Sequence, residues 1–131
     1  VSIAEAAKKA NAKIVGVDVD QAPIIDALAN EDTTITSAMK GLSEAVSTSL
    51  SDIEAGEWST IAATNGNFGL EDGDYIGLPT ADDSWNFETF TTDEYEEVKG
   101  KIKSGEITVD NSSDDATKPT VSEFTTVNYI Q

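Results

Sequence analysis

Ala12-Lys13-Ile14-Val15-Gly16-Val17-Asp18 is the stretch that decides the fold class. It is short, apolar and rich in β-branched residues, and such a run predicts a strand buried on both faces of a parallel sheet. Residues 1–11, ahead of it, carry apolar side chains at helical spacing and predict a helix with no cap before it. Because that helix starts without a cap, we expect the chain to be a fragment of a longer protein.

Downstream of this strand, helix and strand signals alternate. Residues 23–28 predict a short helix, which leads to a second strand at Thr33–Thr36. The clearest helix follows, with Thr36 or Ser37 as its cap and Gly56 at its end. Its buried face is predicted from one apolar stripe, made of Met39, Leu42, Val46, Leu50 and Ile53.

The second half of the chain continues the pattern. Strands are predicted at Ser59–Ala63 and Tyr75–Leu78. Thr91 and Glu94 have the spacing of a capping box, and they open a helix that ends at Gly105. The buried side of this helix is predicted to comprise Tyr95, Val98 and Ile102.

Three further segments complete the chain. Glu106–Val109 alternates like a strand, residues 110–120 are polar, and Val121–Ile130 is compatible with an edge strand. Aromatic side chains in the acidic segment 82–90 are predicted to anchor a loop to the core rather than to stack on a ligand. They are Trp85, Phe87 and Phe90.

The order of elements predicts an α/β domain with a mainly parallel sheet flanked by helices. We expect residues 1–109 to form this domain, as one lobe of a ligand-binding protein. Residues 110–131 are expected to form a polar linker with a C-terminal segment. The chain has 131 residues, enough for a single hydrophobic core.

The charge balance excludes several functions. There are 25 acidic residues against 8 basic ones, giving a net charge of −17. Such a surface repels phosphate backbones and anionic membranes, so no nucleic-acid partner is expected. The absence of Cys and His excludes thiol nucleophiles, Ser-His triads and zinc sites of the usual kind. We predict no metal, no cofactor and no catalytic residue.

Asp18 and Lys40 are the candidate ligand-binding residues. Asp18 ends the first strand, and ligands of open α/β sheets bind beyond the carboxyl ends of the strands. Lys40 is predicted in the first turn of the clearest helix, where a cation opposes the helix dipole. If the two strands are neighbours, both side chains emerge on one rim. The alternatives are a strand end that re-enters water and a lysine whose stem swings into solvent.

Other motifs carry weaker signals. Glu71, Asp72 and Asp74 around Gly73 resemble a loose cation loop, although a solvated acidic turn is the favoured interpretation. An enzyme that uses these carboxylates to hold a metal ion for hydrolysis is one alternative hypothesis for the function. Gly66–Gly69 lacks the strand and helix that frame a phosphate-binding loop.

Several motifs together resemble the BMP (basic membrane lipoprotein) family of substrate-binding proteins of ABC importers, whose best-known members are purine-nucleoside receptors. The similarity begins with Ile14–Gln21 and with Thr36-Ser37-Ala38-Met39-Lys40-Gly41. It continues through Asn67–Leu70 and Asp74–Pro79 to Lys99–Ile107, and it spans about residues 2–109.

The resemblance implies one lobe, the C-terminal one, of a type I periplasmic-binding fold, with a nucleoside clamped between two lobes. It implies that Asp18 binds the ribose hydroxyls and that Lys40 contacts the ribose side. It also implies an ABC-transporter permease as partner and an extracytoplasmic location, with the full-length parent anchored to the cell membrane as a lipoprotein.

The chain departs from the family in three places. The first lobe, the glycine-rich loop before the first helix and the lipid-carrying cysteine are all missing from it. We therefore expect little or no nucleoside affinity from this chain alone. The alternatives with the same fold are a ligand-sensing regulatory module and a sugar-binding receptor.

Overall fold

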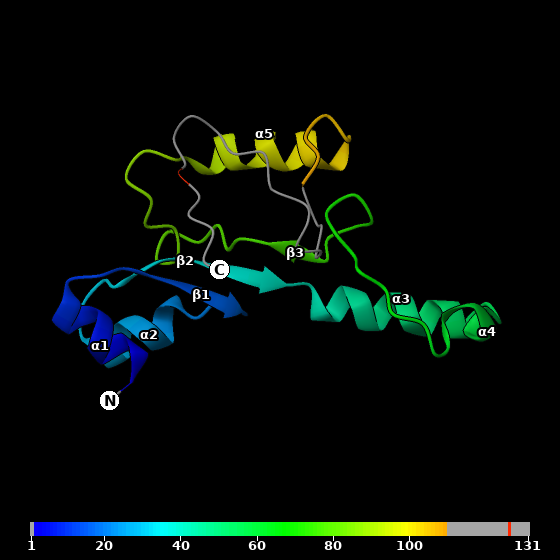
Figure 1. The fold of residues 1–131 in the computed structure, drawn as a ribbon, viewed down its shortest axis with the longest axis horizontal. Coiled ribbons are helices and arrows are strands. Elements are labelled where there is room, and N and C mark those ends of the chain that lie inside the picture. Colours follow the sequence, from blue (N-terminus) through cyan, green and yellow to red (C-terminus); the bar gives the residue numbers. More distant parts are fainter. Residues whose placement is uncertain (1, 110–125, 127–131) are drawn as a thin grey trace.

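Two parallel strands organise the computed structural model, which describes residues 2–109 and 126 (Figure 1). The described elements are α1 (Ile3–Ala10), β1 (Ile14–Asp18), α2 (Ala22–Ala29), β2 (Thr34–Lys40), α3 (Leu42–Glu54), α4 (Trp58–Ile61), β3 (Ile76–Gly77) and α5 (Thr92–Lys103). The polar linker and the edge strand predicted at 121–130 lie outside the described residues, apart from Thr126.

The sheet has the order β1-β2-β3. β1 and β2 run parallel, with Val15 opposite Thr36 and Asp18 opposite Met39. β3 adds a short antiparallel pairing in which Gly77 faces Met39. The predicted α/β class is therefore confirmed, whereas the sheet is mixed and has three described strands.

α1 and α2 form the small apolar core together with the start of β1. Ala4, Ile25 and Ala29 are buried against one another, and Ile14 packs on them. The expectation of an uncapped first helix was wrong, because Ser2 accepts a hydrogen bond from the Glu5 N–H and the Glu5 carboxylate accepts one from the Ser2 N–H. This reciprocal pair is a capping box.

β1 differs from its prediction in burial. Val15 and Val17, which share one face of the strand, remain 56% and 51% exposed. Gly16, on the opposite face, is buried. The strand is thus covered on one face along Val15–Val17, and the apolar run in the sequence did not distinguish this from burial on both faces.

The boundary between β2 and α3 also differs from its prediction. β2 continues to Lys40, and α3 begins at Leu42 after Gly41, which offers no side-chain cap. Ser37 does not cap a helix; it is fully buried, and its hydroxyl accepts a hydrogen bond from the Gln21 N–H at 3.0 Å. Pairing with β1 therefore extends β2 beyond the predicted strand.

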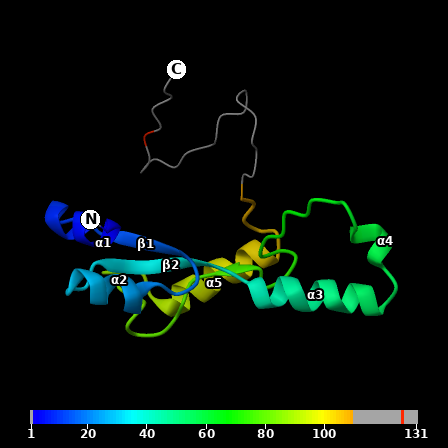
Figure 2. The same ribbon diagram turned by 90° about the horizontal axis from the view of Figure 1, so that it is seen from below.

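Two predicted strands are absent from the described residues. Ser59–Ala63 lies largely within the short helix α4, and Glu106–Val109 forms no strand. α3 and α4 extend away from the sheet in both ribbon views (Figures 1 and 2). No side chain of α3 is buried, so its predicted burial along the apolar stripe was wrong.

α5 lies on the other side of the strands from α1 and α2 (Figure 1). Its predicted capping box is confirmed, because Thr91 accepts from the Glu94 N–H and Glu94 accepts from the Thr91 N–H. The aromatic segment ahead of it packs as predicted, with the Trp85 ring 5.5 Å from Tyr95 and 4.8 Å from Phe87.

Candidate functional site

The rim formed by the carboxyl ends of β1 and β2 brings the two predicted site residues together. Lys40 Nζ lies 2.7 Å from Asp18 Oδ1, and the two side chains remain 60% and 51% exposed. The prediction that neighbouring parallel strands deliver both groups to one rim is confirmed. Lys40, however, is the last residue of β2, so the argument from an opposed helix dipole does not apply to it.

The backbone at Asp18 is strained. Its φ is +72°, and the Val19 N–H donates to the Val17 carbonyl at 2.9 Å, which closes a three-residue turn around it. γ-turns with positive φ are rare, and such strain gathers at sites where the surrounding structure holds one residue in place. The turn ends the strand abruptly and leaves the carboxylate at its edge.

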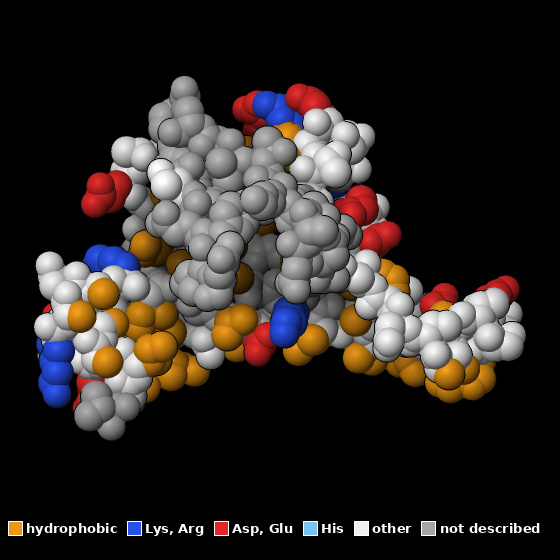
Figure 3. All heavy atoms as spheres, viewed as in Figure 1, with side chains coloured by type: hydrophobic (Ala, Val, Ile, Leu, Met, Phe, Trp, Pro, Cys, Tyr) orange, Lys and Arg blue, Asp and Glu red, His pale blue; other side chains and the backbone are white. Residues whose placement is uncertain are grey.

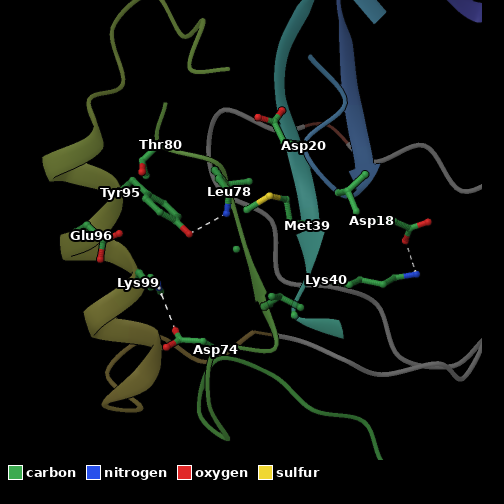
Figure 4. Close-up of a pocket in the computed structure, with 14 residues that line it drawn as sticks. Asp18, Asp20, Met39, Lys40, Asp74, Leu78, Thr80, Tyr95, Glu96 and Lys99 are labelled. Atoms are coloured by element: carbon green, nitrogen blue, oxygen red, sulfur yellow. Dashed lines mark hydrogen bonds and ion pairs between the residues drawn. The ribbon is translucent and has the colours of Figure 1, made fainter. Parts of the chain in front are cut away.

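An open groove of about 390 Å³ extends from this rim towards α5 (Figure 4). Asp18 and Lys40 form one side, and β3 crosses between them and the helix (Figure 4). The polar residues that line the groove include Asp18, Asp20, Lys40, Asp74, Tyr95 and Lys99. Asp20, Tyr95 and Lys99 were missed as site residues from the sequence, and Asp74 was considered only as part of a loose cation loop.

Asp20 joins the rim to the aromatic segment. Its Oδ2 accepts a 2.6 Å hydrogen bond from the hydroxyl of Ser84, which is fully buried, and its Oδ1 accepts from the Ala22 N–H. Both oxygens of Asp20 are therefore already bonded within the protein. We assign this carboxylate a positioning role at the start of α2.

Two glycines allow segments of the chain to approach each other closely beside this rim. A side chain at Gly16 would overlap the Ser37 hydroxyl, which lies against the strand beside it. A side chain at Gly41 would overlap the backbone carbonyl of Asp74, since the Gly41 N–H donates to the Tyr75 carbonyl at 2.6 Å. Gly41 thus lets the end of β2 approach the segment before β3.

The far wall of the groove is held by α5. Asp74 Oδ1 lies 2.7 Å from Lys103 Nζ and 3.4 Å from Lys99 Nζ, and these two ammonium groups, Lys103 first, lower the pKa of Asp74. Partial burial lowers the pKa of Lys99, but the attraction of Tyr95, Glu96 and Asp74 together outweighs it and raises that pKa overall. The Tyr95 hydroxyl accepts the Leu78 N–H at 2.9 Å.

The acidic loop around Gly73 was weighed as a cation site. In the described part of the chain, no group of three or more Asp or Glu side chains is arranged to hold a metal ion. Asp74 instead receives the two lysines of α5, while Asp72 accepts the Gly69 N–H.

The groove therefore offers an acceptor and a donor side by side at one end, and a fixed wall at the other. Adjacent carboxylate and ammonium groups are complementary to the hydroxyls of a polyol.

None of the helices within residues 2–109 has the length and hydropathy of a membrane span.

Comparison with known proteins gave no relative: a scan of protein-family models, a search of curated proteins and a search of solved structures each found no match to this chain. The resemblance to BMP receptors accordingly rests on the motifs alone.

Proposed function

We propose that this chain is one lobe of a two-lobed solute receptor. Its Asp18–Lys40 pair binds adjacent ribose hydroxyls of a nucleoside, and a purine nucleoside is the expected ligand. One observation carries the proposal. The carboxylate and the ammonium, 2.7 Å apart, are delivered by neighbouring parallel strands to the edge of an open groove.

The exposure of this pair supports a role in binding. An ion pair between exposed side chains contributes only about 0–1 kcal/mol, so a ligand replaces it at little cost. A carboxylate that accepts from a sugar hydroxyl forms a charge-assisted bond, which is worth about 1.5–3 kcal/mol. Asp18 and Lys40 are therefore available to exchange their mutual contact for two ligand contacts.

The cellular role proposed with this site is the one that the resemblance implies. The receptor is non-catalytic, passes its ligand to the permease of an ABC importer, and is held outside the cytoplasm by a lipid anchor on its full-length parent. A regulatory module or a sugar receptor with one lobe of the same fold is the alternative.

Titration followed by amide NMR tests the binding step. Because this lobe without its partner is expected to bind at most weakly, adenosine is added to millimolar concentrations, and any binding is expected to shift the amide signals of residues 17–20 and 39–41. 2′-Deoxyadenosine lacks the adjacent pair of hydroxyls, so one charge-assisted bond is lost. Its affinity, measured from the same amide shifts, is expected to be about tenfold lower. Adenosine shifts that arise elsewhere on the chain and spare this rim would remove the proposal.

Variants complete the test. Asp18→Asn and Lys40→Gln are each expected to abolish the shifts, whereas Asp52→Asn on α3 is the matched control and leaves them unchanged. Equal binding of ribose and adenosine would favour the sugar receptor. Equal binding by Asp18→Asn and the unchanged chain would contradict the site assignment.

A further inference from the structure

α3 and α4 together, residues 42–61, form an arm that carries an apolar face with no described cover. In Figure 3 hydrophobic side chains follow the lower edge of this arm, which extends away from the sheet. The stripe consists of Leu42, Val46, Leu50 and Ile53, which are 46% to 61% exposed, and Trp58 continues it at 57%. The stripe of α3 was expected to be buried, and it is instead uncovered in the described residues.

The exposure of the stripe is unfavourable for the arm by itself. α3 has 13 residues and buries none of them. Helices of about 12–15 residues are marginal in water unless an amphipathic face packs against something. A stripe of this kind on a projecting helix therefore marks an interaction surface.

The charges of the arm indicate what covers it. Residues 41–98 contain no Lys or Arg, and the arm itself carries four carboxylates: Glu44, Asp52, Glu54 and Glu57. Within the described part of the chain, none of the four takes part in an ion pair. A second copy would bring the same carboxylates and the same net charge of −17 to the contact, which opposes self-pairing.

We propose that the arm docks a basic amphipathic helix of a partner protein, with apolar side chains on the stripe and Lys or Arg beside the carboxylates. This surface is separate from the groove at Asp18. A hollow of about 280 Å³ lies on the neighbouring face of α3, between this helix, α4 and Phe68, and Trp58 is shared by the hollow and the stripe. An apolar helix face laid against such a surface is a common mode of peptide recognition.

The test uses the whole chain and a fluorescein-labelled peptide of about 14 residues, close to the length of α3. The peptide has Leu on one helical face and Lys on the other, and fluorescence anisotropy follows its binding. We expect micromolar affinity that weakens as salt is added, because exposed charges are screened. The same peptide with Glu in place of Lys is expected to bind at least about 30-fold more weakly.

Two pairs of variants localise the binding. Val46→Ser with Leu50→Ser removes the centre of the stripe and is expected to weaken binding about 30-fold. Ile24→Ser with Leu28→Ser is the matched control, since these residues form a similarly exposed pair, four residues apart, on α2. Neutralising Glu44, Asp52 and Glu54 as Gln, Asn and Gln is expected to flatten the salt dependence, whereas the same change at Asp82, Asp83 and Glu88 is not.

Three outcomes would overturn the proposal. They are absence of peptide binding, equal loss in the α2 control, and a dimer in light scattering that the Val46 and Leu50 changes dissociate. The last result would assign the stripe to a second copy of the chain. An amide NMR spectrum of each variant verifies that the fold is retained.

Discussion

The region around β1 and β2 and the arm formed by α3 and α4 have similar helical signals in the sequence and opposite surroundings in the structure. α2, beside β2, buries Ala22, Ile25 and Ala29, whereas the longer α3 buries nothing. Both helices have apolar side chains at helical spacing. The difference shows that periodicity indicates where a helix forms and which face is apolar, but not which surface covers that face.

The largest effect that tests this comparison is a truncation on each side of it. Ile25→Ala removes a buried core side chain and is expected to cost about 2–5 kcal/mol of unfolding free energy. Leu50→Ala on the arm is expected to change the unfolding free energy by less than about 0.5 kcal/mol, because this side chain is already exposed to solvent in the folded protein. Urea unfolding followed by circular dichroism measures both, and equal losses would refute the contrast.

A smaller effect is expected at the junction where the arm leaves the sheet. Gly41→Ala places a Cβ against the Asp74 carbonyl and is expected to destabilise the fold by about 1–3 kcal/mol. Gly100→Ala in α5 is the control, since its Cβ meets open space and the helix gains about 0.5–1 kcal/mol. Unfolding midpoints that shift in the same direction for both variants would contradict the close approach.

Two tyrosine hydroxyls sharpen the comparison further. Tyr95→Phe leaves the Leu78 N–H without its acceptor and is expected to cost about 1 kcal/mol. Tyr75→Phe removes the hydrogen bond that the Tyr75 hydroxyl donates to the Thr48 hydroxyl on the arm. This change is expected to lower the unfolding free energy by about 0.5 kcal/mol or less. Thermal unfolding of the two variants ranks them, and the reverse order would mean that the arm is more firmly attached than described.

The smallest effect concerns acid. Because Lys103 and Lys99 hold the pKa of Asp74 below its ordinary value of 3.8, the folded carboxyl stabilises the protein above that value. The contribution is lost as the pH falls through the lowered pKa. Asp74→Asn is therefore expected to lower stability at pH 7 slightly and to flatten the pH dependence of unfolding below about pH 4. Parallel curves for the two proteins would exclude the contribution.

Local signals predicted much of the fold near β1. The apolar run at 14–18, the helix that follows it and the capping box at Thr91 each depend on residues close in sequence. The α3 boundary was missed because Thr36 and Ser37 resemble caps by type. In the structure Ser37 bonds the Gln21 N–H, a partner 16 residues away that no local pattern reveals.

The candidate site divides in the same way. Asp18 was found because ligands bind beyond the carboxyl ends of parallel strands, whereas Lys40 was singled out by an argument from the helix dipole that does not apply to the last residue of β2. The two residues lie together because the ends of adjacent parallel strands share one edge. The opposite wall was not predicted, since Asp74 meets Lys103 across 29 residues and Tyr95 meets Leu78 across 17. Buried hydroxyls such as that of Ser84 gave no signal, because serine is common in exposed loops as well.

The bond between Asp20 and Ser84 has a consequence for how this molecule folds. It closes a span of 64 residues, and the entropy lost on closing a loop grows with its length. The β1–α2–β2 unit needs only short-range closures, so we expect it to assemble early. The Asp20–Ser84 contact is then expected to form later in folding than the Asp18–Lys40 pair, which β1 and β2 bring together, and to open earlier when the protein is stressed.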